Sequence, residues 1–112
     1  MTAAIPRYLL PHKAVLKKKL SEDKWGGAEY EVTPLSYVRI VPCRGVRFSL
    51  GGDIPEVSAK MFFDYANSLP CPAPEFEAGD VIAFGGRDYV VGKVNAFYAD
   101  GDEVHHWEVE LT

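Results

Sequence analysis

Two adjacent histidines near the C-terminus, His105 and His106, are the first candidates for a chemical function, because imidazole nitrogens bind zinc. A zinc site needs three or four ligands that converge on one ion. Besides this pair, the sequence contains one more histidine, His12. Neighbouring residues of a strand point to opposite faces, so an extended segment would separate the two rings. We predict no metal site, with His105 facing inward or lying at a strand end and His106 facing solvent.

Other patterns that could carry chemistry are incomplete. Asp100, Asp102 and Glu103 resemble a fragment of a calcium loop, but the full spacing with a distal glutamate is absent from the sequence. The paired glycines match neither a P-loop nor a dinucleotide fingerprint, and no nucleophile elbow is present. The sequence therefore predicts turns at these places, no enzyme activity and no cofactor.

The best candidate for a basic contact surface is the run Lys17, Lys18 and Lys19. Lysines on an edge strand also prevent strand edges from pairing with other chains, which is a purely structural role. A contact with the phosphate backbone of DNA is the functional alternative. Sequence-specific reading of DNA is not expected, because the net charge is −4 and no recognition helix is indicated.

A long loop is predicted over residues 43–58, which contain glycine and proline at several positions. A loop of this length in so small a protein is usually functional or disordered. It is either a plain surface loop or a segment that lines a channel or orders on meeting a partner. The candidate channel or partner residues in it are Arg44, Arg47, Phe48, Leu50 and Asp53.

Length and composition predict one domain covering residues 1–112, with 47% hydrophobic and 25% charged residues. No apolar run approaches the roughly 20 residues that span a bilayer, so no membrane association is expected. Cys43 and Cys71 each lie beside proline and are predicted to be unpaired thiols. We expect synthesis in a reducing cytoplasm.

Charge is unevenly distributed along the chain. Residues 1–24 contain six bases and two acids, and residues 75–112 contain nine acids and two bases. If folding keeps these parts separate, the molecule has a basic and an acidic side, which suits head-to-tail contacts between copies in a ring. If folding interleaves them, the charges are neutralised within one molecule.

Strand signals dominate the sequence. In residues 104–111, apolar and polar residues alternate, with His105, Trp107, Val109 and Leu111 on the expected core face. Residues 80–84 and 87–94, separated by Gly85-Gly86, predict a hairpin, so the C-terminal third should form a three-stranded meander.

Further strands are predicted over residues 12–20, with solvent-facing lysines, and over 29–32, 36–41 and 59–65. Pro34 predicts a break between the second and third of these four segments. One helical turn is expected near residues 5–10, and residues 68–75, with three prolines, predict an extended surface linker. The fold class is therefore all-β: a small antiparallel barrel or sandwich of about 6–8 short strands, with one long loop (43–58) and little helix.

Several short segments, in their order and spacing, resemble phage and prophage minor capsid proteins. The resemblance covers roughly residues 9–111 and rests on Leu10-Pro11-His12, Trp25-Gly26, Val38-Arg39-Ile40, Phe63-Asp64-Tyr65 with Asn67-Ser68, Gly79-Asp80, Tyr89-Val90-Val91 and His105-His106-Trp107-Glu108-Val109. It implies a small β-barrel of the head–tail connector, similar to the stopper proteins that close the portal after DNA packaging. It transfers no catalytic residues.

The resemblance implies a location in the virion at the head–tail junction. The implied partners are portal or adaptor ring proteins, tail-side proteins, further copies of the chain in a ring, and packaged DNA through non-specific contact. Two alternatives remain open: a tail-terminator or tail-completion component, and a small barrel that binds single-stranded nucleic acid. The latter would need exposed aromatic platforms beside basic residues.

Overall fold

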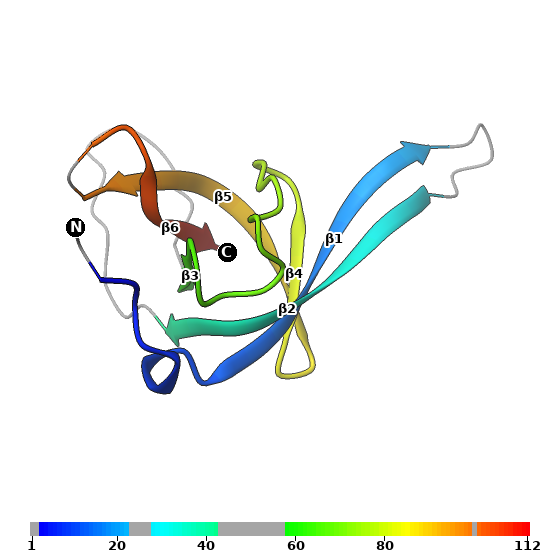
Figure 1. Ribbon diagram of the computed structural model, residues 1–112. Helices are drawn as coiled ribbons and strands as arrows, with labels where there is room; N and C mark the ends of the chain where they lie inside the picture. The colour runs from blue at the N-terminus through cyan, green and yellow to red at the C-terminus, as the bar shows by residue number, and fades with distance from the viewer. Residues whose placement is uncertain (1–2, 23–27, 43–57, 100) are drawn as a thin grey trace, which may run out of the picture.

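Six antiparallel strands form the protein in a computed structural model that describes residues 3–22, 28–42, 58–99 and 101–112 (Figure 1). They close into a barrel in the order β1-β2-β3-β6-β5-β4. Their bounds are β1 His12–Glu22, β2 Ala28–Pro42, β3 Ala59–Asp64, β4 Val81–Phe84, β5 Arg87–Tyr98 and β6 Val104–Leu111. The predicted all-β barrel is confirmed, although β1, β2 and β5 are longer than the short strands expected.

Helix is limited, among the described residues, to the 3-10 turn η1 (Arg7–Leu9), inside the segment where one helical turn was predicted. The C-terminal meander is also confirmed, since β4, β5 and β6 are consecutive neighbours in the barrel. Gly85 and Gly86 join β4 to β5 with φ of 61° and 78°, which side chains other than glycine rarely adopt.

The core of the barrel is apolar and centres on Phe63, which is fully buried. The Phe63 ring meets Trp107 edge-on at 6.0 Å and Phe76 edge-on at 5.4 Å between ring centroids. Phe76 follows the proline-rich linker and adds a side chain that strand periodicity did not predict to lie in the core. Burying a phenylalanine contributes roughly 1.5–3 kcal/mol. Alternating residues of every strand complete this core: Ala14, Leu16, Leu35, Val38, Ile40, Ala59, Met61, Ile82, Val91, Val109 and Leu111.

The predicted break at Pro34 is wrong, because β2 runs through it without interruption. Pro34 pairs with Val15 of β1, and β2 does not begin to pair with β3 until Val38. Position 34 therefore lies where β2 has a strand neighbour on one side only. A proline, which lacks an N–H donor, is tolerated at such an edge.

Beyond the barrel, β1 and β2 continue as a two-stranded ribbon (Figure 1). On the β1 side, β4 pairs only with Val15, Leu16 and Lys17. We call residues 17–22 of β1 and 28–33 of β2 the arm. In Figure 1 the arm leaves the barrel toward the right, well away from the end of β5 and the beginning of β6 at the left. Past Lys17, the described strands pair with the arm along neither outer edge.

Candidate functional site

The outer face of the arm carries apolar and basic side chains together. Tyr30 and Val32 are 49% and 59% exposed. They pair across the ribbon with Lys19 and Lys17, so all four side chains lie on one face. Leu16 is fully buried, which shows that the opposite face of β1 is the one turned toward the core. The arm therefore presents large apolar groups flanked by lysines to the surroundings of the molecule.

The base of the arm is fixed to the barrel by Lys18. This residue lies on the same face of β1 as Leu16, so the prediction of solvent-facing lysines is wrong for Lys18. Its ammonium donates to Asp80 Oδ2 at 2.9 Å and lies 3.5 Å from Glu77 Oε1. Burial opposes the charged form, but the hydrogen bond and charge of Asp80, helped by Glu77, raise the pKa of Lys18 above its ordinary 10.5.

Asp80 itself is held in place by the turn that precedes β4. Its Oδ2 also accepts the backbone N–H of Glu77 at 2.9 Å, and its carbonyl accepts the N–H of Val91 at 2.7 Å. The preceding residue, Gly79, has φ of 94° and donates its N–H to the carbonyl of Val91. The Gly79-Asp80 pair therefore acts as a structural anchor between β5 and the base of the arm.

The uneven charge distribution is partly neutralised by folding. Lys17 lies 3.7 Å from Asp88, and Lys18 contacts Asp80 and Glu77, so the basic N-terminal part meets the acidic C-terminal part within one molecule. The Lys17–Asp88 pair is exposed and contributes at most a few tenths to about 1 kcal/mol. Of the two arrangements left open by the sequence, the interleaved one holds at the base of the arm.

The segment Phe63-Asp64-Tyr65 with Asn67-Ser68 forms a buried polar anchor. Asp64 is fully buried; its Oδ1 accepts the N–H of Ile5 at 2.9 Å, and its Oδ2 accepts those of Ala66 and Asn67 at 3.0 and 2.8 Å. The Asn67 amide donates to the carbonyl of Ile5 at 2.8 Å. Three backbone donors on one carboxylate give a fully satisfied buried charge that ties the N-terminal segment to the end of β3.

A bulge in β2 is supported by the same anchor. Tyr37 has φ of 55°, and it is the residue skipped where β1 partners shift between His12 and Lys13. The buried Ser68 hydroxyl donates to the carbonyl of Tyr37, and the Arg7 guanidinium lies 4.2 Å from the Tyr37 ring centroid. These contacts hold a conformation that costs a non-glycine residue about 1–3 kcal/mol.

The two C-terminal histidines are brought together, which the sequence did not predict. The register between β5 and β6 shifts at His105, so His105 is the extra residue of a bulge. The bulge turns His105 toward His106, and their Nδ1 atoms lie 3.0 Å apart. The prediction that strand alternation separates the two rings is therefore wrong at this position. The prediction that His106 faces solvent is also wrong, because His106 is half-buried.

Each imidazole is also anchored at its far nitrogen. His105 Nε2 donates to the carbonyl of Ala3 at 2.8 Å, and His106 Nε2 contacts Glu108 Oε2 at 3.1 Å. The His106 ring stacks on Phe97, with centroids 4.9 Å apart. The pair closes the N-terminal segment onto β6. Across the described part of the chain, no three His, Cys, Asp or Glu residues are grouped to hold a metal ion.

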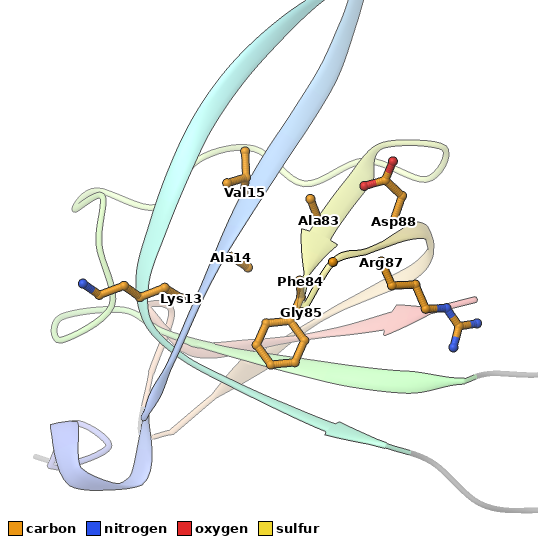
Figure 2. Close-up of a pocket in the computed structure, with 9 residues that line it drawn as sticks. Lys13, Ala14, Val15, Ala83, Phe84, Gly85, Arg87 and Asp88 are labelled. Carbon is orange, nitrogen blue, oxygen red and sulfur yellow. The ribbon is translucent and has the colours of Figure 1, made fainter.

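One open pocket of about 390 Å³ lies beside the turn between β4 and β5 (Figure 2). In Figure 2, the Lys13 and Arg87 side chains extend in opposite directions, and the Phe84 ring lies between them. The Arg87 guanidinium lies 4.7 Å from the Tyr89 ring centroid, and Asp88 pairs with Lys17. Arg87 and Asp88 are therefore engaged in structural contacts within the molecule.

The end of β5 and the beginning of β6 lie at the end of the barrel opposite the arm (Figure 1), and aromatic and acidic residues occur there. Phe97 and Tyr98 are 41% and 58% exposed, and Asp102 and Glu103 are exposed beside them in sequence. We call these four residues the acidic end. The sequence did not predict a site here, whereas the arm contains the predicted basic contact residues Lys17, Lys18 and Lys19. The signal available in the sequence was an aromatic pair just before an acidic turn.

Several predicted residues fall elsewhere. Arg44, Arg47, Phe48, Leu50 and Asp53, like Cys43 and Asp100, lie outside the described residues. Cys71 is an exposed free thiol whose Sγ donates to the carbonyl of Tyr65 at 3.6 Å.

These features define a class: a small closed antiparallel barrel with an apolar core, whose distinctive parts are an exposed arm and an exposed acidic end. The chain belongs to the minor capsid protein family of phages, since the model of that family, described as minor capsid protein, matches residues 6–111. No curated protein and no solved structure matches the chain. No helix in the described residues has the length and apolar character to cross a membrane. The protein thus has a structural role in the phage virion, in association with other virion proteins.

Proposed function

We propose that this minor capsid protein is a stopper-like component of the head–tail junction. Copies form a ring on the portal or adaptor ring, retain packaged DNA and dock the tail. The observation that carries the proposal is the arm, which exposes Tyr30 and Val32 and past Lys17 pairs with no described strand along its outer edges. A two-stranded ribbon of this kind is marginal by itself and gains stability when a neighbour covers it.

The rest of the molecule supports an assembly role over catalysis or nucleic-acid binding. Apolar side chains fill the core of the barrel, and Arg87 and Asp88 of the open pocket make structural contacts. Lys17 and Lys18, both proposed as DNA contacts, pair with carboxylates of the same chain, and this neutralisation weakens their attraction for phosphate groups. We also propose that the loop predicted over residues 43–58 is the segment that lines the channel; residues 43–57 of it lie outside the described residues.

Deletion of the gene in the native phage, followed by electron microscopy of induced particles, tests the proposal. We expect free tails beside heads that are empty or leak DNA. Full heads joined to normal tails would overturn the junction role. Stable, DNA-filled heads beside tails of abnormal length would place the protein on the tail side instead. Complementation from a plasmid controls for effects on neighbouring genes.

A further inference from the structure

We propose that the arm of one copy docks on the acidic end of a second copy of this chain, which makes the contact between neighbours in the ring. This inference rests on the proposed function, because it names the partner of the arm within that ring.

The arm is an incomplete structure in a single molecule. Past Lys17, the described residues of β1 face no partner strand on the β4 side, and β2 meets β3 only from Val38. Tyr30 and Val32 are about half exposed on the outer face. Isolated hairpins are marginal in water, and exposed strand edges invite pairing. A stable arm of this length therefore implies a surface that covers it.

The acidic end matches the outer face of the arm in both apolar character and charge. It contains two partly exposed aromatic residues, Phe97 and Tyr98, at the end of β5, and two exposed acidic residues, Asp102 and Glu103, that follow them closely in sequence. The outer face of the arm offers Tyr30 and Val32, whose cross-strand neighbours are Lys19 and Lys17. Lys17 forms an exposed ion pair with Asp88. Exposed ion pairs are weak, so the Lys17 ammonium can also interact with a carboxylate of a neighbouring copy without a large loss of free energy. Opposite charges at the rim of an aromatic contact favour this pairing over arm on arm or end on end.

The positions of the two surfaces fit a ring. They lie at opposite ends of a molecule whose longest extent is 49 Å (Figure 1). A contact between two different surfaces of identical copies is heterologous, and it repeats from copy to copy until the ring closes. Had the two surfaces been adjacent, the same contact would bury both within a pair and leave nothing for a third copy.

Cross-linking between two single-cysteine variants tests the docking directly. Both carry Cys43→Ser and Cys71→Ser; one adds Val32→Cys on the arm and the other adds Tyr98→Cys at the acidic end. At high protein concentration with a short bismaleimide, we expect the mixture to give far more covalent dimer than either variant alone. Equal yields from the mixture and from Val32→Cys alone would show arm-on-arm contact and overturn the proposal. So would the absence of dimer from all three samples.

Charge exchange provides a second test that does not depend on cysteine geometry. Lys19→Glu should weaken self-association in sedimentation by on the order of tenfold. Asp102→Lys with Glu103→Lys should do the same, and mixing the two reversed proteins should restore association. The matched control is Lys13→Glu, which makes the same change at an exposed residue of β1 outside the arm. A control as damaging as Lys19→Glu, or a mixture without restoration, would refute the charge pairing.

The phage itself separates this inference from the proposed function. If particles lacking the protein fail at the junction, but particles with Tyr30→Ser and Val32→Ser assemble normally, the function stands and the docking is wrong. If particles lacking the protein are normal, the function fails, whatever the cross-links show. We expect a junction defect both in particles that lack the protein and in particles that carry the arm variant. The arm variant should fold like the original by circular dichroism, because both side chains are about half exposed in the single copy.

Discussion

The ion pair between Lys18 and Asp80 makes the sharpest prediction, because it joins the arm to the barrel through two mostly buried groups. Lys18→Met keeps the apolar stem and removes the ammonium. The lysine side chain is 22% exposed and the aspartate side chain 11%, with 2.9 Å between Nζ and Oδ2. Glu77 is 62% exposed and contributes little.

The contribution of the Lys18–Asp80 pair to the free energy of unfolding lies between two known limits. Exposed ion pairs contribute about 0.2–1 kcal/mol, and hydrogen bonds to charged groups about 1.5–3 kcal/mol. Because this pair is mostly buried, we expect its contribution to lie in the range for hydrogen bonds to charged groups. Methionine needs no desolvation of a charge, and this gain offsets part of the lost contribution. We expect Lys18→Met to lower the free energy of unfolding by about 1.5 kcal/mol, with a coupling to Asp80→Asn of about 1 kcal/mol.

Urea unfolding followed by tryptophan fluorescence measures both values in a double-mutant cycle. Lys13→Met, at an exposed position of the same strand, is the control and should change stability little. The pKa of Lys18 is raised on folding, so its contribution is fully present below the unfolded pKa near 10.5 and is lost as pH rises through the higher folded value. The gap between the original protein and Lys18→Met should therefore close only at strongly alkaline pH. A coupling below about 0.3 kcal/mol would refute the reasoning.

Three further substitutions probe other contacts. Asp64→Ala leaves three backbone N–H groups without their acceptor, so we expect a loss of roughly 3–5 kcal/mol in urea unfolding and faster proteolysis of the N-terminal segment; unchanged proteolysis would contradict the anchoring role. His106→Phe keeps a ring against Phe97 but removes contacts to His105 and Glu108, and should cost about 1–2 kcal/mol, whereas a gain in stability would show that the contacts are not stabilising. Gly79→Ala meets no atom within 4 Å but forces φ of 94° on alanine, so a melting temperature lower by several degrees is expected, and no change would mean that the turn relaxes freely.

Local patterns in the sequence determined the fold class. Alternation over residues 104–111 predicted β6, and Gly85-Gly86 predicted the hairpin between β4 and β5, because side-chain period and backbone freedom are properties of neighbouring residues. The resemblance to minor capsid proteins was likewise carried by short segments and is confirmed by the family match over residues 6–111.

Tertiary structure decided what those patterns could not. Pro34 is accommodated because β3 pairs only with a later part of β2, and His105 meets His106 because the register against β5 shifts there. Alternation places Lys18 on the same face of β1 as Leu16, and the tertiary structure supplies the acceptor there, Asp80, 62 positions away. The arm exists because β4 begins at Val81, opposite Lys17, and β3 pairs with β2 only from Val38, so the described strands accompany neither the end of β1 nor the beginning of β2. Each outcome depends on how far one strand extends beside another, and that pairing is set by contacts between residues distant in sequence.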